Sequence, residues 1–129
     1  MITEIKKDKK IMALLVDNSD ISDGTHPITD PNYSLQMIMM SRKKGHIFAK
    51  HTHEKINRSI PMLQEAVIVN KGKLLVTICE RDGKDVGAYE VLAGQCLFLV
   101  DGGYKIEVLE DVLFYEFKNG PFREDKILL

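Results

Sequence analysis

Two histidines separated by one residue, His51 and His53, are the side chains of this sequence best suited to chemistry. In a β-strand, residues i and i+2 point to the same face, so the two imidazoles would stand side by side, roughly 6.6 Å apart at the backbone. Neutral imidazoles bind zinc, iron, copper or nickel, and one carboxylate from a neighbouring strand would complete a facial triad of ligands. The pair therefore predicts a chelating site.

Glu65 is the best candidate for that carboxylate. It opens the apolar run Glu65–Asn70, where a buried charge is unfavourable unless it is paired or ligates a metal ion. On their own, two histidines at this spacing are more often ordinary surface or half-buried residues. Together with the carboxylate, they predict a divalent metal ion held by His51, His53 and Glu65.

Tyr104 is expected to face the same interior. Along Tyr104–Leu109, the apolar set Tyr104, Ile106 and Val108 alternates with charged residues, which places the tyrosine on the buried face of a strand. Its phenol could ligate a metal ion, hydrogen-bond a bound water or donate a proton. Glu65 and Tyr104 are therefore the candidate catalytic residues, and Tyr104 is also a candidate substrate-binding residue.

Arg58 is the second candidate for substrate binding. Its planar fork of N–H donors suits a carboxylate or a phosphate of a ligand. It lies in the polar segment Glu54–Leu63, where solvent exposure without a ligand is the alternative.

Strands are the elements that must position these residues. Short apolar runs rich in Val, Ile, Leu, Phe and Tyr recur between turn signals, whereas helical periodicity is almost absent, and this pattern is typical of an all-β sandwich or barrel. The nine expected strands are Ile11–Asp17, Leu35–Ser41, His46–His51, Gln64–Asn70, Lys73–Glu80, Val86–Leu92, Cys96–Val100, Tyr104–Leu109 and Val112–Lys118.

Glycine-containing turns are expected to separate several of these strands, because glycine tolerates a positive φ. The expected turns are Asn70-Lys71-Gly72, Arg81-Asp82-Gly83-Lys84, Ala93-Gly94-Gln95 and Asp101-Gly102-Gly103. The polar segment Asn18–Ser34, which contains two prolines, has the composition of a loop across one end of a barrel.

The composition favours one domain spanning residues 1–129, since 44% hydrophobic residues suffice for a single core. Lys and Arg number 18 against 19 Asp and Glu, so no basic excess favours nucleic acid. No apolar run approaches the roughly 20 residues that span a bilayer, so we expect a cytoplasmic protein without membrane contact. Cys79 and Cys96 fall in expected strands and are expected to be buried free thiols.

The spacing of glycines around the histidines and Glu65 resembles the first motif of the cupin superfamily, G-x5-H-x-H-x3,4-E-x6-G. Gly45, His51 and His53 match its first half, and Glu65 and Gly72 match its second half. Eleven residues, Glu54 to Gln64, separate the two halves, which requires a longer loop than the motif has. Such an insertion is tolerated because loop-closure cost grows slowly with length.

The second cupin motif, G-x5-P-x-G-x2-H-x3-N, is matched in part. Gly94 and Gly102 fit its glycines, whereas Val100 replaces the proline, Lys105 the histidine and Leu109 the asparagine. The usual fourth metal ligand is therefore missing. Shortening the turn by one residue would put Tyr104 in its place.

The resemblance implies a jelly-roll β-barrel of two facing antiparallel sheets, with its core at about residues 35–118. It further implies a homodimer and a bound iron, zinc, manganese or nickel ion. The leading functional hypothesis is a metal-binding cupin-fold protein, an isomerase or oxygenase if it is an enzyme, that acts on or binds a small polar molecule such as a sugar or a keto or hydroxy acid. Two alternatives are a metal-free epimerase-like or ketoisomerase-like enzyme using histidine and tyrosine, and a non-catalytic ligand-sensing or structural cupin.

Overall fold

The computed structural model describes residues 1–58, 60–120 and 126–129, and within them strands are the regular elements. The strands are β1 (Ile2–Lys7), β2 (Lys10–Val16), β3 (Gly24–Pro27), β4 (Ile38–Ser41), β5 (Glu65–Cys79), β6 (Asp85–Leu92), β7 (Cys96–Leu99) and β8 (Gly103–Lys118). All their pairings are antiparallel. The all-β class is confirmed. Within the same residues, no helix has the length and apolar character required to traverse a bilayer.

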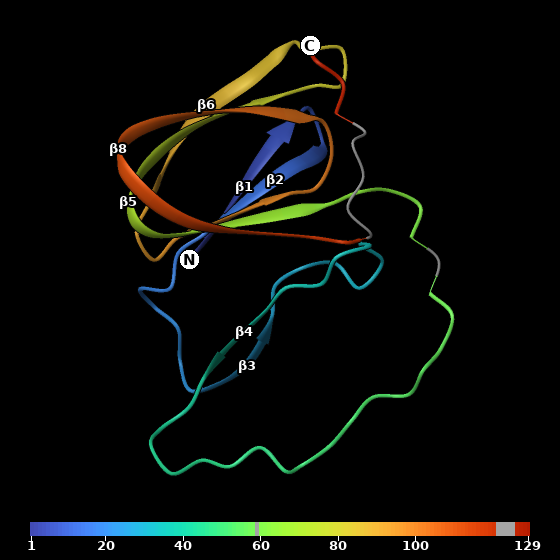
Figure 1. Ribbon diagram of the computed structural model, residues 1–129, viewed down its shortest axis with the longest axis vertical. Coiled ribbons are helices and arrows are strands. Elements are labelled where there is room, and N and C mark those ends of the chain that lie inside the picture. The colour runs from blue at the N-terminus through green and yellow to red at the C-terminus, as the bar shows by residue number, and fades with distance from the viewer. Residues whose placement is uncertain (59, 121–125) are drawn as a thin grey trace.

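One strongly curled sheet holds most of the strands, and its shape is that of a half-barrel (Figure 1). Its order is β1-β2-β7-β5-β6, and β8 pairs with β5 outside this path. β3 and β4 form a separate two-stranded sheet. The described residues thus form one curled antiparallel sheet and one small sheet, and the two facing sheets of a jelly roll stay a prediction.

β5 and β8 form a long antiparallel ribbon that bends along its length. At one end Glu65 pairs with Lys118, and at the other end Cys79 pairs with Gly103. The first half of β5 also pairs with β7, and the second half pairs with β6. Register shifts between residues 69 and 74 mark the bend, because bulges bend a strand and increase its twist.

Gly72 permits this bend. Its φ is +88°, in the region that favours glycine, and a Cβ atom built there would lie 2.1 Å from the carbonyl oxygen of Asp111 on β8. The sequence Asn70-Lys71-Gly72 was expected to connect two strands. It lies instead inside one strand, where glycine serves a bulge rather than a turn.

Two apolar clusters lie on opposite faces of the sheet. The inner cluster, within the curl, contains Ile5, Met12, Ala13, Val67, Val69, Leu74, Val76, Ile78, Val91 and Leu97. The outer cluster contains Leu14, Val16, Ala66, Cys96, Phe98 and Val100, and side chains of residues 28–39 pack against it. β2 and β7 are thus buried on both faces, which explains why their sequences are continuous apolar runs rather than alternating ones.

Gln64 links residues 28–39, called the outer layer below, to the sheet by hydrogen bonds. Its side chain is 1% exposed, its Oε1 accepts a hydrogen bond from the backbone N–H of Leu35 (3.0 Å), and its Nε2 donates to the carbonyl of Val100 (3.2 Å). Its own N–H donates to the Asn119 side chain at 2.8 Å. Because both polar atoms of the Gln64 side chain have partners, the buried amide joins residues 28–39 to the sheet at little desolvation cost.

The segment 42–58 lies outside any strand, and the expected strand His46–His51 is absent from the single chain. Figure 1 shows the segment as part of a long open connection between β4 and β5. Ile47 is 84% exposed and Phe48 55% exposed. Alternating side chains make a sequence able to form a strand, but a strand also requires a neighbouring edge, which this segment does not meet.

The other differences from the expected strands concern merging and omission. Gln64–Asn70 and Lys73–Glu80 fall, apart from their outermost residues, within the single strand β5, and Tyr104–Leu109 and Val112–Lys118 fall within β8.

Strand β1 was not predicted because most of its residues are exposed and Ile5 alone is buried. Strand β3, which lies in the expected loop Asn18–Ser34, was not predicted because its sequence GTHP has weak strand propensity.

Gly72→Ala is expected to destabilise the protein by more than Gly45→Ala. Both glycines have positive φ, +88° and +94°, and alanine in that region costs about 1–3 kcal/mol. Only Gly72 would add a clash, since nothing lies within 4 Å of a Cβ atom at Gly45. Urea denaturation measures both free energies of unfolding, and equal losses would contradict the role of Gly72 in the bend.

Candidate functional site

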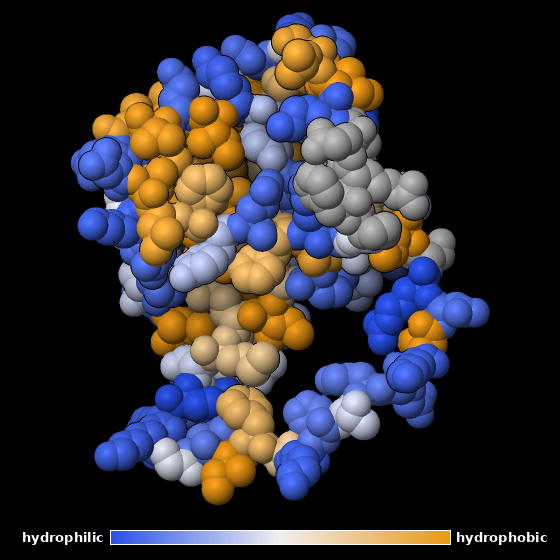
Figure 2. Space-filling model, viewed as in Figure 1, coloured by the Kyte–Doolittle hydropathy of each residue, from blue (hydrophilic) through white to orange (hydrophobic). Residues whose placement is uncertain are grey.

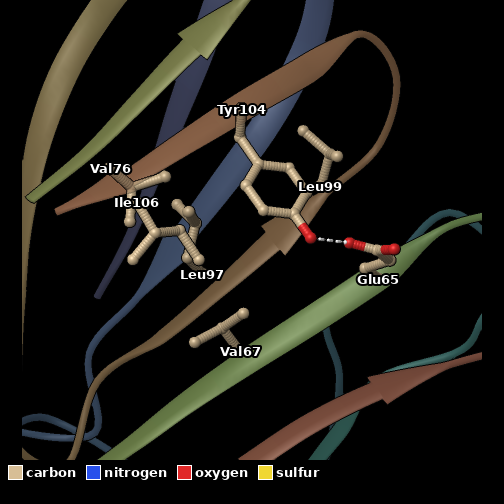
Figure 3. A pocket seen from close by; sticks show the side chains of 7 residues that line it. All are labelled: Glu65, Val67, Val76, Leu97, Leu99, Tyr104 and Ile106. Carbon is tan, nitrogen blue, oxygen red and sulfur yellow. Dashed lines mark hydrogen bonds between the residues drawn. The ribbon is translucent and has the colours of Figure 1, made fainter. Parts of the chain in front are cut away.

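An apolar hollow lies inside the curl of the sheet, and Figure 3 shows its lining. The lining residues are Glu65, Val67, Val76, Leu97, Leu99, Tyr104 and Ile106. The centre of a water molecule can move within about 10 Å³, which is on the order of the space that one water requires. The hollow therefore has room for one water or one ion, and a larger ligand would have to bind at its mouth.

Glu65 and Tyr104 form the polar part of this hollow. The Glu65 residue is 9% exposed, and the Tyr104 hydroxyl donates a hydrogen bond to its Oε2 (Figure 3). Tyr104 pairs with Ile78 near the end of β5, whereas Glu65 is the first residue of β5. The bond therefore joins the two ends of the bent ribbon across the inside of the curl.

A second carboxyl group, that of Glu116 on β8, lies beside the same phenol. Its Oε1 is 3.1 Å from the Tyr104 hydroxyl oxygen. A phenol has one hydrogen and can donate to one carboxylate at a time. Both contacts are hydrogen bonds when Glu65 carries a proton and donates it to the phenol oxygen, so the neighbouring Glu116 favours the protonated form of Glu65.

The electrostatics of the cluster point the same way. Burial raises the pKa of Glu65; the Tyr104 hydrogen bond and the Lys118 charge lower it, while Glu116 raises it, and the net shift is upward. Burial and the adjacent Glu65 carboxylate raise the pKa of Tyr104 far above its ordinary value. The phenol therefore stays protonated and acts as a hydrogen-bond donor at neutral pH.

His51 and His53 lie together but away from this hollow. Their ring centroids are 5.2 Å apart, and both residues are exposed in the segment 42–58. The Nδ1 atom of His51 lies 2.7 Å from the Ala49 carbonyl oxygen. Because a carbonyl only accepts, Nδ1 carries the hydrogen and Nε2 carries the lone pair, which is the tautomer that a metal ligand needs.

The donors expected for the metal ion do not converge in this arrangement. Over residues 1–58, 60–120 and 126–129, no three His, Cys, Asp or Glu side chains are grouped so as to hold one ion. The donor chemistry fits a divalent transition metal, since His51 and His53 offer imidazole nitrogens and Glu65 a carboxylate. The metal site therefore stays a prediction that requires the histidines to reach Glu65.

Arg58 is exposed and does not line the hollow. Its predicted role in substrate binding also stays a prediction. Cys79 and Cys96 are buried free thiols, as expected, and burial raises the pKa of Cys96 to about 11.

Glu116 is the site residue that sequence reasoning missed. In Val112–Lys118 the large apolar residues Leu113, Tyr115 and Phe117 alternate with it, so alternation predicts that Glu116 faces outward. In the structure these three residues are 50–55% exposed, and Glu116, also exposed, lies beside the Tyr104 hydroxyl. The signal that could have revealed it is register, since Glu116 pairs with Val67, which belongs to the inner cluster.

Comparisons with known proteins do not place the chain in a family. No family model matches it, and no curated protein or solved structure matches it at a significant level. The cupin resemblance therefore rests on the motif spacing in the sequence.

The raised pKa of Glu65 predicts a pH-dependent stability difference between the wild type and Glu65→Gln. A raised pKa means that the folded state binds this proton more tightly than the unfolded chain, whose value is 4.5. The contribution is complete below pH 4.5 and is lost as the pH rises through the folded pKa. The variant should therefore gain stability relative to the wild type from pH 4.5 upward, until the difference levels off.

Urea denaturation over a pH series measures this difference. Asp17, whose pKa is lowered to about 2 by hydrogen bonds from Gln95 and Ser19, affects both proteins equally and cancels. Tyr104→Phe removes the hydrogen bond that lowers the Glu65 pKa, so its stability should continue to fall to a higher pH. A difference between wild type and Glu65→Gln that does not change with pH would contradict the assignment.

Proposed function

We propose that the protein is a metal-binding, cupin-type protein that acts on or binds a small polar molecule such as a sugar or a keto or hydroxy acid. The observation that carries this proposal is the buried Glu65 carboxyl, which shares an apolar hollow with the Tyr104 hydroxyl that donates to it. Burying a carboxylate is costly, and a metal ion is one of the few partners that compensates for it. A cytoplasmic location and a homodimer are part of the same proposal.

The proposed ion is iron, zinc, manganese or nickel, held by His51, His53 and Glu65. The His51 tautomer supports this assignment, because its Nδ1–H donates to the Ala49 carbonyl and leaves Nε2 as the nitrogen that could bind the ion. When bound, the ion would polarise a carbonyl or a water molecule.

A further strand on the free edge of β8 would bring the histidines to the hollow and turn the half-barrel into the proposed jelly roll. Within the described residues, β8 pairs with β5 alone, so no neighbouring strand covers its other edge. Val108 lies on the same face as Tyr104 and Ile106, yet it is 59% exposed. The inner face of β8 is therefore exposed at Val108, next to the edge where the further strand would pair.

Glu65 and Tyr104 have complementary chemical roles in this proposal. Tyr104, with its raised pKa, keeps its proton and donates a hydrogen bond to an oxygen in the hollow. Glu65, whose pKa is also raised, takes up and releases a proton more readily near neutral pH than an exposed carboxylate does. The pair therefore suits proton transfer at the mouth of the hollow, with Arg58 as the candidate group for an anionic substituent.

Zinc binding tests the metal site directly. Isothermal titration of the untagged full-length chain should give one site per chain for the wild type. His51→Ala, His53→Ala and Glu65→Gln should each weaken binding by roughly tenfold or more, because each removes one of three ligands. His46→Ala, which removes an imidazole in edge-to-face contact with Phe48, is the matched control and should bind as the wild type does. Equal binding by all four variants would contradict the ligand set.

A metal-free proton-transfer enzyme is the second candidate, and the hydrogen bond between Tyr104 and Glu65 favours it. In that case turnover of a sugar or keto acid would survive a strong chelator and would be lost in Tyr104→Phe. If activity disappears with the chelator and returns when metal is added, this second candidate is wrong.

The non-catalytic alternative is supported by the size of the hollow, which accommodates about one water. It predicts that metal raises the melting temperature, with no turnover across a panel of sugars and keto acids. Conversion of any substrate by the wild type but not by Glu65→Gln would exclude it.

A further inference from the structure

The segment of residues 42–58, called the basic segment below, differs in charge from the rest of the chain. It contains six cationic residues and one acidic residue, which gives it a net charge of +5. Because the whole chain has a net charge of −1, the remaining residues carry −6. The cationic residues are Arg42, Lys43, Lys44, Lys50, Lys55 and Arg58, and the acidic one is Glu54.

The basic segment also exposes large apolar side chains. Ile47 is 84% exposed, Phe48 55% and Ile56 59%. Figure 2 shows the long connection that contains the segment standing off from the body of the molecule. Such apolar exposure in a charged segment is typical of a surface that another polypeptide covers.

The strand β8 has exposed apolar and acidic residues, which are complementary to the apolar and cationic residues of the basic segment. Its outer face presents a row of exposed apolar residues, Leu113, Tyr115 and Phe117, and Ile68 of β5 pairs beside Tyr115. Along the strand, four acidic residues outnumber two lysines. They are Glu107, Glu110, Asp111 and Glu116, against Lys105 and Lys118. Within the described residues, no strand pairs with the other edge of β8, and its apolar row is exposed.

We infer that the basic segment of one copy adds to the free edge of β8 in a second copy, so that each site takes Glu65 and Tyr104 from one chain and His51 and His53 from the other. This inference rests on the proposed metal site. A second copy is the partner that the structure favours, because a single chain exposes both the basic segment and the outer face of β8. In a two-fold dimer, the basic segment of each chain covers β8 of the other, so the same contact forms twice.

The pattern of side chains in the segment suits this addition. In an extended strand, Ile47, Ala49 and His51 share one face with His53, whereas Phe48 and Lys50 share the other. The first face would continue the inner surface formed by Tyr104 and Ile106. The second face would place Phe48 beside the outer face of β8 and Lys50 near its acidic residues.

Mixing two inactive variants tests whether the site is shared. The double variant His51→Ala/His53→Ala and the variant Glu65→Gln are co-expressed with different non-metal-binding tags, and zinc content is measured after both tags are used for purification. In a shared site, each mixed dimer has one intact site, so zinc binding should recover to about half of the wild-type value. If both ligand groups come from one chain, no recovery occurs.

The outcomes separate this inference from the proposed function. Zinc binding by the wild type without recovery in the mixed dimer overturns the shared site but leaves the metal site standing. Absence of zinc binding in the wild type overturns the metal site and, with it, the shared site.

The oligomeric state provides an independent readout. Lys43→Glu/Lys44→Glu/Lys50→Glu should raise the dissociation constant of the dimer by roughly tenfold or more in sedimentation, because it reverses the charge of the basic segment. Lys6→Glu/Lys7→Glu/Lys9→Glu makes the same change in charge near the β1–β2 turn and should have little effect. A monomeric wild type, or equal effects of the two triple variants, would contradict the inference.

Discussion

The bend of the β5–β8 ribbon is the constraint on which the rest of this structure depends. Each strand contributes its first half to one part of the curled sheet and its second half to another, so the two must change direction together. The carbonyl of Asp111 passes so close to Gly72 that a side chain has no room there. This contact allows residues thirteen positions apart on one strand, Glu65 and Ile78, to lie on opposite sides of the same apolar interior.

The hydrogen bond between Tyr104 and Glu65 follows from that bend. Neither residue would be near the other in a flat ribbon, because they belong to opposite ends of it. Closing the curl excludes water from around the carboxyl, raises its pKa and makes the phenol its principal partner. Fold and chemistry are therefore coupled here, since the same curvature that buries the apolar core also produces the polar cluster.

The sequence predicted the parts of the structure that depend on local pattern. Alternation correctly placed Tyr104 on the inner face, and the apolar run that Glu65 opens correctly predicted that this residue is buried. The alternation of side chains gave wrong predictions where strand formation or side-chain direction depends on a neighbouring strand. His46–His51 has the alternation of a strand but meets no edge in the single chain, and Glu116 faces the site although its apolar neighbours predicted otherwise. The local sequence also could not predict that two expected strands form one strand through Gly72, because a glycine suits a turn and a bulge equally well.

Gln64 gives the outer layer an influence on the site that its position alone does not suggest. It is the residue before Glu65, and its side chain is fixed between Leu35 and Val100. Any displacement of the layer is thus transmitted through one peptide unit to the carboxyl group. Substitutions in residues 28–39, far from the hollow in sequence, would therefore change the pKa of Glu65 although they make no contact with its carboxyl group.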